Sequence, residues 1–187
     1  MVWFAFAGHL LYDNLRKNFT EVVTLNKEMK KIRWLTQGAA IAALYVVLTL
    51  VFAPISFGPM QVRISEILTI LPLFTPAAIP GLFIGCVIGN IAGGAIILDV
   101  IFGSIATLIG AAAGYLLRFN RWLVPIPTII ANALIVPFVL KYGYGIDLPL
   151  YLMAIYVAIG EVIGCFVLGE LFASVLLKRK GVFKLEK

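Results

Sequence analysis

Apolar runs alternate with short polar or proline-rich breaks along most of the chain, and this pattern predicts six membrane-spanning helices. A helix needs about 20 apolar residues to cross a bilayer, and runs of roughly that length recur from residue 32 onward. The last run is longer than a crossing requires, which predicts a tilted helix. The predicted spans are about residues 32–53, 63–80, 81–98, 100–117, 122–140 and 150–177.

Two features break or shape these runs. Pro72 and Pro76 interrupt the second run, which predicts a kinked or broken helix. Broken helices can present backbone groups to a ligand. Small residues repeated every four positions favour close helix packing in lipid, and the third run has such a stripe at Gly81, Gly85, Gly89 and Gly93.

The first 31 residues differ from the rest. Residues 2–11 are apolar but too short to span, and residues 13–31 mix charged and apolar positions. They predict a weakly amphipathic surface helix, or else Met29 is the biological start, because a basic flank follows it directly before the first span. We therefore divide the chain into an amphipathic or non-native extension (1–31), a transmembrane domain (32–180) and a basic tail (181–187).

Composition supports an all-α integral membrane protein. Of 187 residues 62% are hydrophobic and 13% charged, with a mean hydropathy of +1.05, whereas soluble domains are about 45–50% apolar. The net charge of +6 does not predict nucleic-acid binding, because the basic residues lie between spans and at the ends. The positive-inside rule places most of them, and both termini, in the cytoplasm. These residues are Lys30, Lys31, Arg33, Arg118, Arg121, Lys178, Arg179 and Lys180.

The sequence offers little for catalysis, metal or cofactor binding. Cys86 and Cys165 both lie inside apolar runs, no CxxC occurs, and His9 is the only histidine. These facts argue against a disulfide, a metal centre and an HExxH protease. No GxxxxGK[ST] loop is present, so ATP hydrolysis would need separate subunits. We expect no catalytic residues, metal or cofactor.

Polar side chains within the apolar runs are the candidate ligand-binding groups. A charge at membrane depth costs about 2.5–3.5 kcal/mol on insertion scales, so such residues default to function. Their mixed sign suits a flat organic solute in an aromatic-lined pocket better than a proton path, and Phe57, Tyr144, Tyr151 and Tyr156 are available aromatics. The candidates are Arg63, Glu66, Asn90, Asp99, Asn132 and Glu161.

Structural alternatives exist for several of them. Arg63 and Glu66 are three apart, share a helix face and could form a mutual ion pair. Asp99 could cap a helix, and Asn90 could serve helix packing. Glu161 and Glu170 are nine apart, which on an α-helix places them on opposite faces, so Glu170 would pair with nearby basic residues or with a partner protein.

Three segments carry a resemblance to a known family. Gln61-Val62-Arg63-Ile64-Ser65-Glu66, Thr75-Pro76-Ala77-Ala78-Ile79-Pro80-Gly81 and Asp99-Val100-Ile101-Phe102-Gly103-Ser104-Ile105-Ala106-Thr107-Leu108 resemble the QueT family, over about residues 30–180. Members are substrate-binding (S) components of energy-coupling-factor (ECF) transporters, thought to take up queuosine precursors. The resemblance implies a six-helix S-component-like bundle in a bacterial plasma membrane. It also implies a partner module of two ATPases and a transmembrane coupling protein.

The resemblance also implies a cargo, and the chemistry of that cargo suggests roles for the candidate residues. The cargo would be a 7-deazaguanine such as 7-aminomethyl-7-deazaguanine, or queuine, captured from outside and delivered by reorientation of the whole S component. Glu161 or Glu66 would accept from its pyrimidine edge, Asn90 or Asn132 would donate to its carbonyl, and Asp99 would bind its amine.

A face of small residues in the first span is the second implied site. Ala39 and Ala43 are four apart, with Ala42 beside them, and packing within the chain is the alternative to a docking role. The resemblance implies that this face docks the coupling protein. Rival functions are an S component for another vitamin-like solute, a stand-alone secondary transporter or channel, and an intramembrane enzyme.

Overall fold

The structure is a computed structural model that describes the backbone of residues 2–56 and 63–178, and side chains from residue 23 onward within those ranges. Phe57, the rest of the segment 57–62 and the tail 181–187 lie outside the described residues. The chain divides into two units, residues 1–36 and 37–187. All regular structure in the described ranges is helical.

Helix α1 (Val2–Val51) supplies the whole of the first unit. Within that unit the described side chains, residues 23–36, are exposed. Thr36 Oγ1 donates to the Ile32 carbonyl at 2.9 Å, a local bond within the helix. The division of the chain at residue 31 and the role of Met29 stay predictions.

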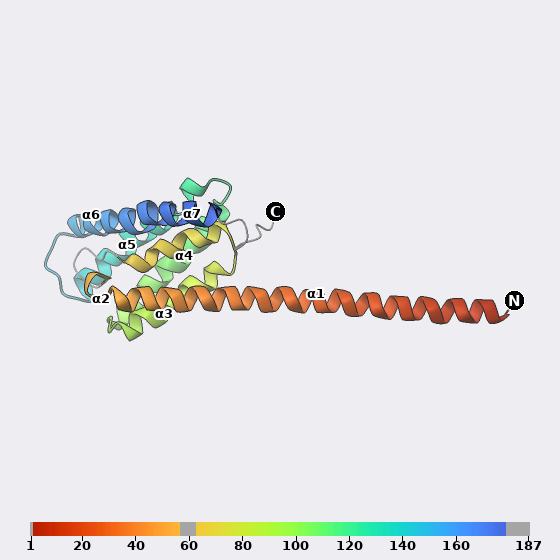
Figure 1. Ribbon diagram of the computed structural model, residues 1–187. Coiled ribbons are helices and arrows are strands. Elements are labelled where there is room, and N and C mark those ends of the chain that lie inside the picture. The colour runs from red at the N-terminus through yellow and green to blue at the C-terminus, as the bar shows by residue number, and fades with distance from the viewer. Residues whose placement is uncertain (1, 57–62, 179–187) are drawn as a thin grey trace. The chain divides into compact units, whose positions relative to one another are not determined.

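The second unit is a bundle in which α4, α5 and the run α6–η4–α7 lie side by side (Figure 1). Helix α3 packs against α4. Two short elements, η2 and η4, are π-helical, whereas η1 and η3 are 3₁₀-helical. After α1 the elements are α2 (Ala53–Ser56), η1 (Ile64–Leu73), α3 (Ala78–Ala92), η2 (Asp99–Gly103), α4 (Ser104–Leu116), η3 (Arg121–Leu123), α5 (Ile126–Tyr142), α6 (Leu150–Glu161), η4 (Val162–Leu168) and α7 (Gly169–Lys178).

Four helical segments of the described chain are long and apolar enough to cross a membrane: Val23–Val51, Asp99–Leu116, Arg121–Tyr142 and Leu150–Lys178. The prediction of an all-helical chain with segments able to cross a membrane is therefore confirmed for the described residues. The other two predicted spans correspond to shorter apolar helices, Ile64–Leu73 and Ala78–Ala92. The count of six crossings and the side on which the termini lie stay predictions.

The second apolar run is broken, as its prolines predicted. Pro72 lies inside the 3₁₀-helix η1, and α3 begins at Ala78, three residues before the predicted start at residue 81. Helix η1 packs against α3, α4, η4 and α7, and most of its side chains are buried. Because side chains three apart eclipse in a 3₁₀-helix, Glu66 and Thr69 share a face of this interior element.

The glycine stripe packs helices, as predicted. A Cβ on Gly81 would lie 2.7 Å from the Gly38 carbonyl, and one on Gly85 would lie 2.8 Å from Tyr45 Cβ and 3.0 Å from the Ala42 carbonyl. Helix α3 therefore approaches the backbone of α1 directly. Ala42 lies on this inner side and is buried.

The last helical run does not keep α-helical geometry between Glu161 and Glu170. The π-helix η4 separates them, and its i→i+5 bonding widens the turns. The opposite-face prediction assumed 100° per residue throughout, which does not hold across residues 162–168. Both carboxylates are buried within the protein.

Candidate functional site

Two buried carboxylates face each other where η1 meets the end of α6. Glu66 is 1% exposed and Glu161 is 4% exposed. One ligand atom from each of them and from Cys165 lie within 4.8 Å of one another. Two full charges 4.8 Å apart would repel by about 3.5 kcal/mol at an effective dielectric constant of about 20. The pair therefore favours either a shared proton or a cationic, donor-rich group between the two.

Three helices hold these carboxylates in place. Tyr45 on α1 donates its hydroxyl to Glu66 Oε1 at 2.7 Å. Asn132 Nδ2 on α5 donates to Glu161 Oε1 at 2.9 Å, and Cys165 Sγ on η4 donates to Glu161 Oε2 at 2.9 Å. Three of the four carboxylate oxygens thus have a donor within the protein.

Two acceptors beside these bonds remain open. Glu66 Oε2 and Asn132 Oδ1 are buried and have no hydrogen-bond partner among the described residues. An unsatisfied buried acceptor costs about 1–3 kcal/mol, and more when it is charged. A ligand with several N–H donors would remove that cost, so the cluster of Glu66, Glu161 and Asn132 is the candidate binding site.

Arg63 and Asp99 form a second polar group. Arg63 Nη2 lies 2.9 Å and 3.0 Å from the two Asp99 carboxylate oxygens, and the side chains are 3% and 0% exposed. Tyr144 donates its hydroxyl to Asp99 Oδ2 at 3.1 Å. Burial and the Asp99 charge raise the pKa of Tyr144, so its hydroxyl remains a donor. The carboxylate joins Arg63 to the α5–α6 connection, whereas the N-cap of η2 is Leu98.

Asn90 supports this second group from α3. Its Nδ2 donates to the Asp99 carbonyl at 3.3 Å and lies 3.5 Å from Cys86 Sγ, which also receives Thr107 Oγ1 at 3.5 Å. The side chain is 1% exposed. These contacts show Asn90 joining helices, which was the structural alternative for this residue.

The two polar groups adjoin each other along η1 and η4. A Cβ on Gly164 would lie 3.0 Å from the Arg63 carbonyl and 3.7 Å from Glu66 Cβ. Glu66, Glu161 and Asn132 thus form one group. The other three candidates, Arg63, Asp99 and Asn90, form a second group beside it.

Sequence reasoning missed Tyr45 and Cys165. Their spacing could have indicated them, because residues three or four apart lie on one face of a helix. Tyr45 is three residues after Ala42, and Cys165 is four residues after Glu161. Two predicted pocket aromatics are instead at the surface, since Tyr151 is 66% exposed and Tyr156 37%. Their side chains are too accessible to form the wall of a buried pocket.

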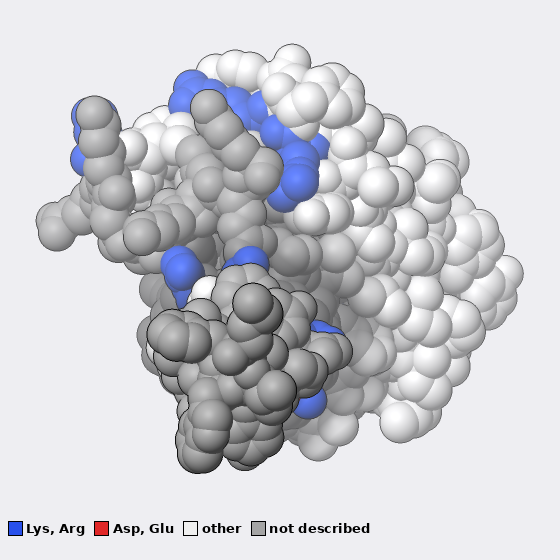
Figure 2. Space-filling view, turned by 90° about the vertical axis from the view of Figure 1, so that its right-hand side faces the viewer, with Lys and Arg blue, Asp and Glu red and all other residues white. Residues whose placement is uncertain are grey.

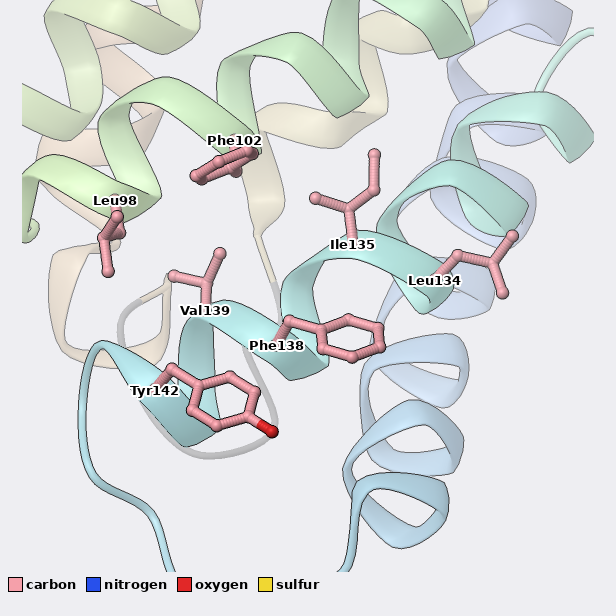
Figure 3. A pocket seen from close by; sticks show the side chains of 7 residues that line it. All are labelled: Leu98, Phe102, Leu134, Ile135, Phe138, Val139 and Tyr142. Atoms are coloured by element: carbon pink, nitrogen blue, oxygen red, sulfur yellow. The ribbon is translucent and has the colours of Figure 1, made fainter.

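An apolar pocket of about 410 Å³ lies between η2 and α5 (Figure 3). Phe138 and Tyr142 stack with ring centroids 6.4 Å apart, and both are largely exposed. This surface suits hydrocarbon rather than a polar solute. Its lining residues are Leu98, Phe102, Leu134, Ile135, Phe138, Val139 and Tyr142.

The end of the bundle at which α4 and α7 end is basic. Arg121 Nε lies 3.4 Å from Glu170 Oε2, so Glu170 pairs with a cation from η3. Arg118 and Lys178 are exposed near this end. Figure 2 shows Lys and Arg atoms, and no Asp or Glu atoms, on the described part of the face in view.

The family model described as QueT transporter matches residues 35–178. The chain belongs to the QueT transporter family. It is also similar to a Lactococcus lactis subsp. cremoris (strain MG1363) protein named "Queuosine precursor transporter QueT", with 41% identity over 86 residues. That alignment covers 45% of this chain and 50% of the relative, so the chain spans about half the length of the relative it matches. No solved structure matches the chain.

The family is one of transporters, and four described helical segments of this chain are long and apolar enough to cross a membrane. The matched region begins within α1 and ends with α7. It contains Tyr45, Glu66, Asn132, Glu161 and Cys165. Both polar groups therefore belong to the part of the chain that defines the family.

Proposed function

We propose that this chain is the substrate-capture component of an ECF-type importer and binds a queuosine precursor from outside the cell. The printed name of the Lactococcus relative supports the class of cargo. The observation that carries the proposal is the pair of open acceptors, Glu66 Oε2 and Asn132 Oδ1, beside the Glu161 carboxylate.

The chemistry of a 7-deazaguanine complements this cluster. Its pyrimidine edge has two adjacent N–H donors that one carboxylate accepts as a pair, and its aminomethyl group, which lies beside the carbonyl, can donate to an amide oxygen. A cationic aminomethyl group would lie against the second carboxylate, which removes the repulsion between Glu66 and Glu161. The carbonyl of the base would accept from the Asn132 amide once that amide leaves Glu161.

Arg63, Asp99 and Asn90 form the margin of the site in this proposal. The Arg63 and Asp99 side chains already bind each other, Tyr144 donates to Asp99, and the Asn90 side chain donates to the Asp99 backbone carbonyl. Opening the Arg63–Asp99 pair would leave the buried Asp99 carboxylate without its cation, so in this proposal the pair stays closed when the solute is bound. The aminomethyl group then lies between Glu66 and Glu161 rather than against Asp99.

The topology proposed is six membrane crossings with both termini in the cytoplasm of a bacterium. The ends of α4 and α7 and the start of η3 carry exposed or half-exposed cations, and such residues concentrate on the cytoplasmic side of membranes. Helices η1 and α3 complete the count as a broken pair: η1, with about 2.0 Å rise per residue, covers about 20 Å over its ten residues.

Docking to the energising module would use the outer face of α1. Ala39 and Ala43 are exposed, one helical turn apart, while Ala42 packs inward against α3. A flat surface of small side chains permits close approach of another helix in lipid. The module's two ATPases would then drive reorientation and release.

Binding by the purified chain tests the capture step. The protein without any other subunit should bind 7-aminomethyl-7-deazaguanine saturably at one site per chain, measured by isothermal titration calorimetry. Absence of binding by folded protein to this compound and to queuine would refute the proposed cargo. Binding of a vitamin that is not a deazaguanine, tested in the same way, would indicate an S component with another substrate.

Uptake into proteoliposomes tests the coupling step. Transport should require ATP and the energising module, and Ala43→Trp should reduce it at least tenfold without changing solute affinity. Ile155→Trp is the matched control, because Ile155 is half exposed on α6 and should tolerate a large apolar group. Ion-driven uptake by the chain alone would instead establish a stand-alone secondary transporter.

A further inference from the structure

The polar cluster contains a ligand set that an organic solute does not require. Glu66, Glu161 and Cys165 offer two carboxylate oxygens and a sulfur, all within 4.8 Å of one another. Thiolate together with carboxylate is a donor set for borderline-soft dications such as Zn²⁺. All three side chains are buried.

The distances are close to those of a metal centre. Zn–S bonds are about 2.3 Å and Zn–O bonds about 2.0–2.2 Å, so two ligand atoms at the tetrahedral angle around one ion lie about 3.5 Å apart. The separations within the cluster, at most 4.8 Å, would have to shorten by up to about 1.3 Å through side-chain rotation when the ion binds. The cation would lie between two carboxylates that otherwise repel.

Asn132 supplies an observation separate from the acidic pair. Its side chain is 0% exposed, its Nδ2 is bound to Glu161 Oε1, and its Oδ1 has no hydrogen-bond partner among the described residues. An amide oxygen adjoining the carboxylates can serve as a fourth, neutral ligand. Zinc sites are most often four-coordinate, so the three ligands and this oxygen complete a set.

We propose that Glu66, Glu161, Cys165 and Asn132 form a site for a thiophilic divalent cation such as Zn²⁺. Binding displaces the proton that Cys165 Sγ now donates to Glu161 Oε2 and the proton that the two carboxylates share, and both protons leave to solvent. The dication with two carboxylates and one thiolate then has a net charge of −1. The organic solute uses the same carboxylates but not the sulfur.

Cobalt titration tests the site directly. In chelator-treated, folded wild-type protein, Co²⁺ should produce thiolate-to-metal charge-transfer absorption, and Zn²⁺ should abolish it by displacement. Cys165→Ser should remove the absorption and weaken Zn²⁺ binding at least tenfold. Cys86→Ser is the matched control, since Cys86 is an equally buried cysteine that contacts Asn90 and Thr107, and it should keep the absorption.

Glu161→Gln provides a second variant if the serine substitution prevents folding, and it should also weaken Zn²⁺ binding at least tenfold. No charge-transfer absorption in folded wild-type protein, or equal absorption in Cys165→Ser, would overturn the metal site. Deazaguanine binding is measured separately on wild-type protein in chelator. Failure of that measurement refutes the proposed cargo and leaves the metal result standing.

Discussion

Replacing Glu161 by glutamine removes one charge from the buried pair while keeping the size and shape of the side chain. Glu161 now accepts from Asn132 and Cys165, each at 2.9 Å. A hydrogen bond to a charged group contributes about 1.5–3 kcal/mol. At 1.4 kcal/mol per tenfold change, loss of one such bond to the solute should weaken binding by about 10- to 150-fold.

Stability should respond in the opposite direction from affinity. The substitution relieves the repulsion between Glu66 and Glu161, so the ligand-free variant should melt at the same temperature as wild type or higher. Solute affinity is measured by isothermal titration calorimetry and melting temperature by intrinsic fluorescence, both in detergent. A variant that loses affinity because it is damaged would instead show a lowered melting temperature.

Glu170→Gln is the matched control for this measurement. It makes the same chemical change in the same helical run, but Glu170 pairs with Arg121 at the basic end. Its solute affinity should match wild type. Unchanged affinity in folded Glu161→Gln, or an equal loss in Glu170→Gln, would refute the assignment of Glu161 as a ligand.

Three further substitutions test the surroundings of the site. Tyr45→Phe leaves Glu66 Oε1 without its donor and should lower the free energy of unfolding by about 1–3 kcal/mol; an unchanged denaturation midpoint would contradict that bond. Gly85→Ala places a Cβ 2.8 Å from that of Tyr45 and should lower the melting temperature, whereas a rise would show that α1 and α3 separate freely. Arg63→Ala leaves Asp99 buried without its cation and should destabilise by about 3–5 kcal/mol; thermal melting with no loss would contradict a structural ion pair.

The helical class was readable from the sequence because apolar length alone decides whether a segment can cross a membrane. The broken second run was also readable, since Pro72 and Pro76 interrupt it. The extent of the 3₁₀-helix could not be predicted from the sequence. Its hydrogen bonds span one residue fewer than those of an α-helix, and the same pattern of apolar residues fits both. In the 3₁₀-helix Glu66 and Thr69 eclipse each other, whereas in an α-helix they would be offset on a shared face.

The candidate site was predicted as a set of residues but not as an arrangement. Glu66, Asn132 and Glu161 were chosen because burying a polar side chain in an apolar segment is costly. Their grouping depends on how three helices pack, which the sequence does not show. Arg63 was expected either to bind ligand or to pair with Glu66, and it pairs with Asp99, which is 36 positions away in sequence. The π-helix η4 determines how Cys165 lies relative to Glu161, and no pattern of residues in the sequence predicts a π-helix there.

Equilibrium binding of 7-aminomethyl-7-deazaguanine to the purified wild-type chain tests the central claim most directly. The account predicts saturable binding at one site per chain, with stabilisation against thermal unfolding of about 2.7 kcal/mol when the solute is at 100 times its dissociation constant. Folded protein whose melting temperature stays constant across the full range of solute concentrations would contradict it.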